Sequence, residues 1–225
     1  MKQQPLTLAE VLAVLGDSRS VPDLQRYFLG AGGAAFAGGQ FERLGGGGDR
    51  PEISGTVTAE DLIAVQLLSV QVRPHRALDL LQGQLGRRLA AELAEIPVAI
   101  ELGTDEALPF IVSGGHADKA WRMLRDADDI GWVIAGKLLA RKRPKLVPVY
   151  DRVVSCAYGT GTGFWKWLHE MLRAEGGVLA HRLDACHTTA GLPTAVSRLR
   201  VLDVVFWMRH RDQHRPGGCP GLRLP

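Results

Sequence analysis

Apolar residues recur at helical spacing along most of the chain after residue 57. The sequence TAED forms a capping box, with Thr58 as the cap and Asp61 three residues later, and it predicts a helix start. Pro74 suits the first turn of a second helix. The apolar positions that follow these two starts are Leu62, Val65 and Leu68, and then Leu78, Leu81, Leu85, Leu89, Leu93 and Ile96. Each set lines one face of its predicted helix.

Further helical patterns fill much of the remaining chain. A first helix is predicted to begin near Thr7. The other predicted helices cover residues 118–125, 134–140, 164–174 and 194–209, and the stretch from Asp151 to the sequence GTGTG at 159–163. Alternating β-branched runs bounded by turns do not accumulate. The pattern therefore predicts an all-α fold.

The segment between Gly30 and Gly48 differs from the rest, because nine of its residues are glycine. The sequence GGGGD within it has the composition of a phosphate-binding loop. No Gly-Lys-Ser/Thr follows it and no apolar strand precedes it, so that interpretation fails. We predict a flexible connector in which a few aromatic residues pack.

Composition and charge exclude several classes of protein. A chain of 225 residues can form one domain or two small ones, and 46% hydrophobic with 23% charged residues is ordinary for a globular protein. The net charge of +3 is too small to indicate a nucleic-acid partner by itself. No apolar run is long enough to span a bilayer, and the N-terminal sequence lacks a secretory cleavage pattern. We expect a cytoplasmic protein without a membrane partner.

The cysteines give no indication of a metal site. Cys156, Cys186 and Cys219 are odd in number, lie far apart and form no C-x-x-C pair. Zinc and iron–sulfur sites usually show such paired spacing. We therefore expect incidental thiols, no metal and no cofactor.

The stretch from residue 129 to residue 151 carries the candidate chemistry. A turn containing Gly131 lets backbone N–H groups face a phosphate, and the helix after it adds its positive end. Four cations follow that helix, namely Arg141, Lys142, Arg143 and Lys145. Asp151 comes after an apolar run, where a carboxylate can also serve as the cap of the next helix.

The sequence DIGWVIAGKLLARKRPKLVPVYDRVV resembles the helix-hairpin-helix segment of the base-excision DNA glycosylase superfamily, of the endonuclease-III-like type. The superfamily has a hairpin L-P-G-V-G-x-x-T-A, then one helix, an apolar stretch and an essential Asp. Gly131 matches the second hairpin glycine, Ala135 the final alanine and Asp151 the essential Asp. The separation of 20 residues between Gly131 and Asp151 matches without a gap.

A second patch supports the resemblance. DLIAVQLLSVQ at 61–71 is similar to a helix upstream of the hairpin, with Gln71 at the position of a glutamine that fills the space left by a displaced base. The chain departs from the pattern at Asp129, which replaces the first hairpin glycine, and at Ile134, which replaces the threonine. The whole chain is also similar to an uncharacterised bacterial family sharing LGGGGDRPE, GKLLARKRP-LVPVYD and LRVLDVV.

The resemblance implies a two-lobed helix-hairpin-helix fold with Asp151 at a central cleft. Residues 58–145 would form the central helical lobe with the hairpin. Residues 1–57 together with 146–210 would form the second lobe. The tail at 211–225 is expected to be disordered.

The resemblance also implies a monofunctional DNA N-glycosylase, because Val133 stands where bifunctional members carry a Schiff-base lysine. Asp151 would assist hydrolysis of the glycosidic bond, and Gln71 would occupy the gap left by the flipped base. The residues expected to contact DNA are Gln71, Ile130, Gly131, Val133, Arg141, Lys142, Arg143 and Lys145. Trp132 and Tyr150 would form the wall of the base pocket.

Two other functions fit the same residues. One is a glycosidase of a free nucleoside or nucleotide, which needs the Asp but no DNA-binding face. The other is a non-catalytic nucleic-acid-binding module in which Asp151 is only a helix cap.

Overall fold

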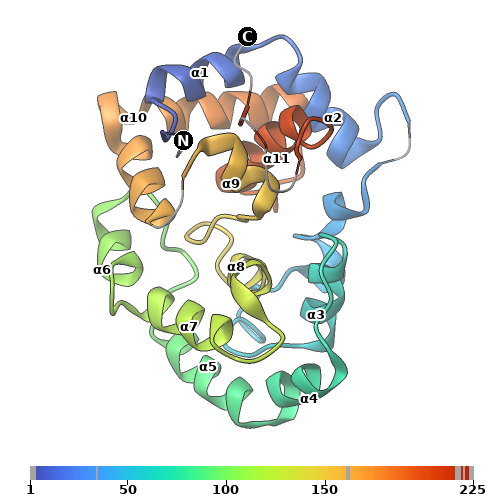
Figure 1. Cartoon of the computed structure of the whole chain (residues 1–225), viewed down its shortest axis with the longest axis vertical. Coiled ribbons are helices and arrows are strands. Elements are labelled where there is room, and N and C mark those ends of the chain that lie inside the picture. The colour runs from blue at the N-terminus through green and yellow to red at the C-terminus, as the bar shows by residue number, and fades with distance from the viewer. Residues whose placement is uncertain (1–3, 34, 161–162, 216–218, 220, 223–225) are drawn as a thin grey trace. The chain divides into compact units, whose positions relative to one another are not determined.

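The computed structural model describes residues 4–33, 35–160, 163–215, 219 and 221–222. These residues form helices and turns with no strand among them, so the predicted all-α class is confirmed. The chain divides into two compact units, labelled by their helices in Figure 1. Unit 1 comprises Met1–Phe36 and Tyr150–Pro225, and unit 2 comprises Ala37–Val149.

Unit 2 is built around α8, whose second half is buried on all sides. Figure 1 shows α8 between α3 and α7, and it contacts both. The α-helices of unit 2 are α3 (Ala59–Gln66), α4 (Pro74–Gln82), α5 (Gln84–Ala94), α6 (Leu108–Ile111), α7 (His116–Arg125) and α8 (Gly131–Lys142). Its 3₁₀ turns are η1 (Ala37–Gln40), η2 (Leu44–Gly46) and η3 (Asp105–Ala107).

A buried carboxylate joins α3 to the end of α8. Thr58 and Asp61 form the predicted capping box, in which the Thr58 backbone N–H donates to Asp61 Oδ2 at 3.0 Å. Arg141 Nε donates to Asp61 Oδ1 at 3.0 Å, and Lys142 Nζ donates to Asp61 Oδ2 at 2.6 Å. The three side chains are at most 1% exposed. Burial lowers the pKa of Lys142, although the contact with Asp61 opposes that shift.

The glycine-rich segment wraps around the same cluster. The guanidinium of Arg141 donates to the carbonyls of Phe41 and Leu44. A Cβ on Gly48 would lie 2.6 Å from the Arg141 carbonyl and 2.7 Å from Asp61 Oδ1, so only glycine fits there. The prediction of a flexible connector is therefore wrong for residues 37–48, because the interior of unit 2 requires this backbone to satisfy a buried cation.

The side chain of Arg143 also binds backbone carbonyls, two of them near the C-terminal end of α5. Its guanidinium donates to the carbonyls of Ile96 at 2.7 Å, Ser54 at 2.9 Å and Leu93. Two of these carbonyls, those of Leu93 and Ile96, lie at the C-terminal end of α5, where a helix leaves carbonyls without a full set of partners. Burial lowers the pKa of Arg143 to about 10.

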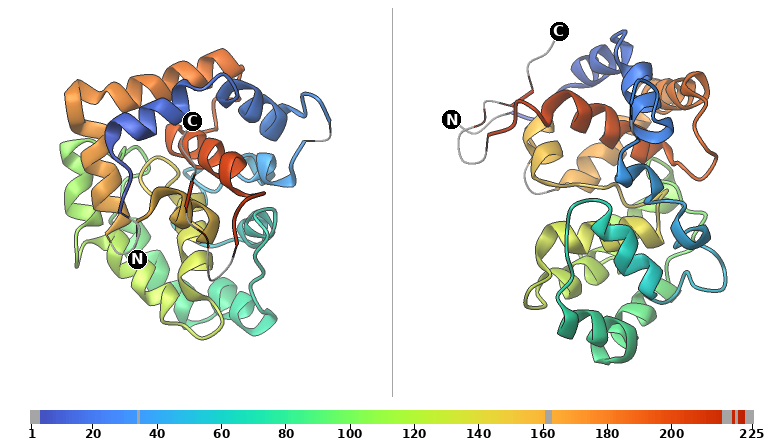
Figure 2. Two further views of the ribbon diagram at one scale, coloured as in Figure 1. Left: turned by 45° about the horizontal axis from the view of Figure 1, so that its top comes forward. Right: turned by 90° about the vertical axis from the view of Figure 1, so that its right-hand side faces the viewer.

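Unit 1 is arranged around α11, which is buried on nearly every side. The helices of unit 1 are α1 (Leu8–Gly16), α2 (Ser20–Leu29), α9 (Arg152–Tyr158), α10 (Phe164–Ala190) and α11 (Arg198–His210). The other four all contact α11 (Figure 2). Inside the unit, Arg200 forms an ion pair with Asp203 and donates to the Tyr27 hydroxyl at 2.8 Å. A helix buried all round needs such internal partners for its few charges.

Several helix boundaries differ from the sequence-based prediction. The helix predicted to run from Pro74 to Ile96 breaks at Gly83, where a Cβ would lie 2.2 Å from Asp79 Oδ1. Asp79 Oδ1 instead accepts the Leu85 N–H at 3.1 Å and starts α5. The helix predicted over 164–174 resumes after a break at 174–177 and continues to Ala190. The helix over Ser20–Leu29 was missed, while the start of α1 at Thr7 is confirmed.

The lobe boundaries differ as well. Residues 37–57 belong to unit 2 rather than with the N-terminal segment, and 146–149 also remain in unit 2. The tail was predicted to be disordered beyond Arg211. Residues 211–215, Cys219 and 221–222 have defined positions, and the His214 N–H donates to the His210 carbonyl at 2.8 Å. The rest of the tail lies outside the described residues. Within the described part of the chain, no helix combines the length and the apolar character needed to cross a membrane.

We predict that Asp61→Ala destabilises the protein by about 3–5 kcal/mol, because it leaves two buried cations without their carboxylate. Urea denaturation of the purified variant measures the change. The matched control is Asp126→Ala, which removes a carboxylate of the same unit that is 61% exposed. That control should leave the stability nearly unchanged, because the carboxylate is exposed and its ion pair is screened by solvent. Equal losses in the two variants would contradict the structural role of Asp61.

Candidate nucleic-acid interface

The turn between α7 and α8 forms a tight hairpin. The Ile130 N–H donates to the Ala127 carbonyl at 3.2 Å, and α8 begins at Gly131. Asp129 has φ 65° and Gly131 has φ 63°, so both adopt the left-handed conformation. Asp129 thus takes the backbone geometry expected of the first hairpin glycine, which Asp tolerates better than most residues.

The start of α8 faces open space. A Cβ placed on Gly131 would have no heavy atom of the described chain within 4 Å beyond its sequence neighbours. Among the described residues, no side chain caps the N-terminus of this helix. Such a helix end attracts an anion through its N–H groups and its dipole.

The two carboxylates of the hairpin are directed toward the start of α4. Asp129 pairs with Arg73 Nε at 3.3 Å and with His75 Nε2 at 3.4 Å. Asp128 Oδ2 pairs with Arg76 Nη2 at 3.2 Å, and Arg76 Nε also donates to the Asp128 carbonyl at 2.8 Å. These pairs offset the negative charge that would otherwise repel an anion at the turn.

The same pairs bring the loop that carries Gln71 beside the hairpin. Gln71 is exposed and lies two residues before Arg73, which contacts Asp129. From the other side, Lys137 of α8 donates to the Leu68 carbonyl at 2.8 Å and fixes the end of α3. Gln71 and Gly131 therefore lie on neighbouring segments of unit 2.

The basic residues Arg141, Lys142 and Arg143 are buried inside unit 2. Arg141, Lys142 and Arg143 are 1–3% exposed, and their cationic groups bind Asp61 and backbone carbonyls. The prediction that these three residues bind DNA is wrong, since moving them to a ligand would leave internal acceptors unsatisfied. Lys145 is half exposed and pairs with Glu101 at 3.2 Å.

The remaining hairpin positions differ in accessibility. Ile130 is buried, and its N–H is used within the turn, so it is not a phosphate donor as predicted. Trp132 and Val133 lie half-buried in the first turn of α8. A ligand at the helix N-terminus would meet their backbone before their side chains.

Asp151 is the N-cap of α9 in unit 1. Its Oδ1 accepts the N–H groups of Val153 at 3.0 Å and Val154 at 3.1 Å. The side chain is half-buried. These two hydrogen bonds fix the direction of the Asp151 carboxylate. A carboxylate held in this way can serve only as a helix cap, or it can serve as a cap and also take part in catalysis.

Tyr150 is engaged within unit 1. Its ring stacks on Phe164 with centroids 4.0 Å apart, and its hydroxyl donates to Ser155 Oγ at 2.8 Å and contacts Thr160. Burial raises the pKa of Tyr150. The ring is thus a packing element of unit 1, and its predicted role as a pocket wall gains no support.

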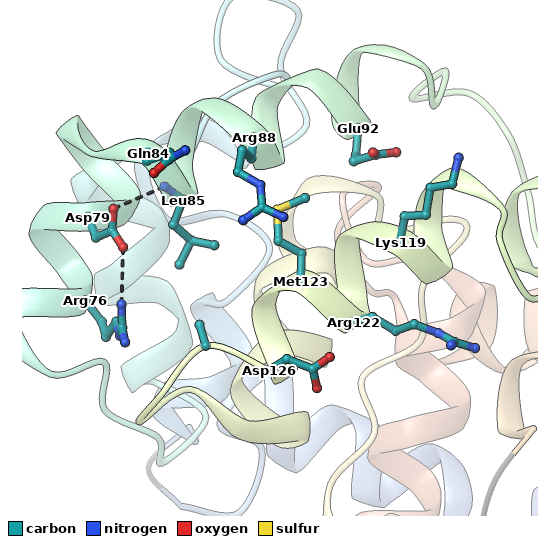
Figure 3. A pocket seen from close by; sticks show the side chains of 11 residues that line it. Arg76, Asp79, Gln84, Leu85, Arg88, Glu92, Lys119, Arg122, Met123 and Asp126 are labelled. Atoms are coloured by element: carbon teal, nitrogen blue, oxygen red, sulfur yellow. Dashed lines mark hydrogen bonds and ion pairs between the residues drawn. The ribbon is translucent and has the colours of Figure 1, made fainter.

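A groove of about 590 Å³ lies between α4, α5 and α7 and reaches the hairpin at Asp126 and Ala127. Figure 3 shows Arg88 of α5 extending toward Met123 of α7 across it. Its cations are Arg76, Arg88, Lys119 and Arg122, and its carboxylates are Asp79, Glu92 and Asp126. No pattern in the sequence indicates this groove, because its charges come from three separate helices.

Four metal-ligating side chains meet in unit 1. Cys156, His210, His214 and Cys219 are the group of this kind found among the described residues, with ligand atoms all within 4.8 Å of one another. Cys156 and Cys219, which are far apart in the sequence, therefore lie close together in the structure.

Comparison with known proteins gives one match. The model of a protein family described as a family of unknown function (DUF6308) matches residues 20–210. No curated protein and no solved structure matches the chain.

The left-handed backbone at Asp129 leads to a stability prediction. Asp129→Ala removes exposed ion pairs and keeps a side chain in a strained conformation, whereas Asp129→Gly removes the same pairs and relieves the strain. The glycine variant should be more stable than the alanine variant by about 1 kcal/mol. Urea denaturation of both variants measures the difference. Equal stabilities would mean that residue 129 is not left-handed in solution.

Proposed function

The chain belongs to this family of unknown function, and we propose that it is a monofunctional N-glycosylase-like protein that acts on a base in DNA. The proposal includes the two-lobed helix-hairpin-helix fold. The observation that carries it is the pairing of the Gln71 loop with the α7–α8 hairpin through Arg73 and Asp129. A base-displacing enzyme needs a side chain that enters the stack close to a turn that holds the backbone.

The hairpin supplies the phosphate contact in this proposal. The open N-terminus of α8 at Gly131 accepts a phosphate oxygen, and the paired Asp128 and Asp129 do not repel it strongly. Because Arg141, Lys142 and Arg143 are buried, the additional positive charge beside the phosphate must come from exposed cations near the turn. Arg73, with a side chain 67% exposed, is placed to supply this charge.

Asp151 is the proposed catalytic residue. A carboxylate beside the glycosidic carbon stabilises an oxocarbenium-like transition state and orients or deprotonates water. Its two backbone hydrogen bonds would hold it in one direction for that task. Val133 offers no amine, so the proposed reaction has no Schiff-base or strand-cutting step.

The second candidate is a non-catalytic binding module. The observation that favours it is the capping of α9 by Asp151, which gives this residue a structural task of its own. The burial of Arg141, Lys142 and Arg143 lowers the duplex affinity expected of either candidate and does not separate them. This candidate retains the hairpin and Gln71 as contacts and lacks turnover.

We expect wild-type protein to release a base from at least one member of a panel of duplexes carrying alkylated, oxidised or deaminated bases, read by mass spectrometry. Asp151→Asn should lower that release by about 100-fold or more, since a neutral amide cannot stabilise positive charge. Asn is as good an N-cap as Asp, so the variant should remain folded.

Asp184→Asn is the matched control, because it neutralises an exposed carboxylate of the same unit that pairs with Arg198. It should leave base release unchanged. If folded wild type and Asp151→Asn are equally silent across the panel, the catalytic proposal fails and the binding module is favoured. Free nucleosides in the same panel distinguish a small-molecule glycosidase.

Gln71→Ala should weaken binding to a duplex with an abasic site by about tenfold, or ~1.4 kcal/mol, because nothing then fills the gap in the stack. Fluorescence anisotropy with a labelled duplex at two salt concentrations measures this. Gln66→Ala is the control, since Gln66 is exposed near the end of α3. The role of Gln71 is excluded if both variants bind like wild type.

A further inference from the structure

Four side chains from three parts of unit 1 meet near the C-terminal end of α11. Cys156 lies in α9, His210 ends α11, His214 follows one turn later, and Cys219 comes from the tail. Their ligand atoms all lie within 4.8 Å of one another. Cys219 Sγ is 3.2 Å from His210 Nε2, and the two imidazole centroids are 5.5 Å apart.

The imidazoles in this cluster lack part of their hydrogen bonding. His210 is completely buried, and its Nδ1 has no hydrogen-bond partner among the described residues. His214 Nδ1 is also buried and has no partner in the same part of the chain. A buried polar nitrogen without a partner is costly, and native structures rarely contain one without a reason. The imidazole ring can turn over and exchange its two nitrogens, so either can face an ion.

We propose that Cys156, His210, His214 and Cys219 together bind one zinc ion. Two thiolates and two imidazoles are a ligand set that zinc prefers, and the cluster contains no carboxylate that would favour magnesium or calcium. In a tetrahedral site with bonds of about 2.0–2.3 Å, ligand atoms lie about 3.3–3.8 Å apart. The side chains therefore need to close by only about 1 Å to reach that geometry.

The site is structural in character. Four protein ligands fill the tetrahedral shell and leave no position for water or substrate. The ion would join α9 to the end of α11 and the tail, which lie far from α9 in the sequence. It would also hold the tail at Cys219, whose Sγ lies 3.2 Å from His210 Nε2.

The first test is the metal content of the full-length protein, purified without a metal-chelating tag and kept reduced. Inductively coupled plasma mass spectrometry should find about one zinc per chain. Cys219→Ser and His214→Ala should lose most of that zinc. The controls Cys186→Ser and His181→Ala remove a thiol and an imidazole outside the cluster, and should retain it. Circular dichroism checks that each variant is folded.

The second test uses the wild type alone, so it does not depend on variants that fold. Removing metal with a chelator should lower the melting temperature, and one equivalent of zinc chloride should restore it. One equivalent of cobalt chloride should give the intense visible bands of a tetrahedral site, together with thiolate charge-transfer absorption. These bands should be absent in Cys219→Ser.

Three results would overturn the proposal. The first is reduced wild type that contains no zinc and binds neither zinc nor cobalt. The second is unchanged metal content in both cluster variants. The third is metal-free protein in which a Cys156–Cys219 disulfide forms and accounts for the proximity of the two thiols.

Discussion

The buried carboxylate of Asp61 is the interaction on which unit 2 depends. It caps α3 from within and neutralises Arg141 and Lys142 at the end of α8. Two cations against one carboxylate leave excess positive charge in the interior, and backbone carbonyls of the glycine-rich segment accept the remaining N–H groups of Arg141. Gly48 is needed because no side chain fits between Asp61 and the Arg141 backbone. The glycine-rich segment is thus held by charge as well as by the buried ring of Phe41.

The sequence patterns predicted correctly those parts of the fold that depend on a few adjacent residues. The capping box at Thr58, the helix starts at Thr7 and Pro74, and the turn before Gly131 each depend on a few adjacent residues, and each is present in the structure. The break at Gly83 depends on the Asp79 side chain reaching Leu85, which no periodicity reveals. The burial of Arg141, Lys142 and Arg143 was missed for the same reason. Asp61 and Arg141 are 80 residues apart in the sequence, and only the structure shows that their side chains pair.

The same difference between contacts of adjacent residues and contacts of distant residues applies to the candidate sites. The hairpin was found from its glycine, and the left-handed Asp129 shows that the turn tolerates a departure from the expected residue. The pairing of the Gln71 loop with that hairpin depends on ion pairs between Arg73, His75 and Asp129, which come from two distant segments. The Cys and His cluster was missed although His210, His214 and Cys219 lie close together in the sequence, because the fourth member, Cys156, comes from α9 and the cysteines show no paired spacing. Short-range spacing rules identify only sites whose ligands share a loop or a helix.

The short helix α9 connects the two proposals within unit 1. It has only seven residues, and a helix of that length has little stability of its own. Asp151 fixes its N-terminus by capping, and Cys156 lies near its C-terminus among the proposed zinc ligands. A helix held at both ends keeps the direction of its cap residue, whereas one held at a single end frays. The zinc site would therefore determine how rigidly the Asp151 carboxylate is presented, even though it takes no part in the proposed chemistry.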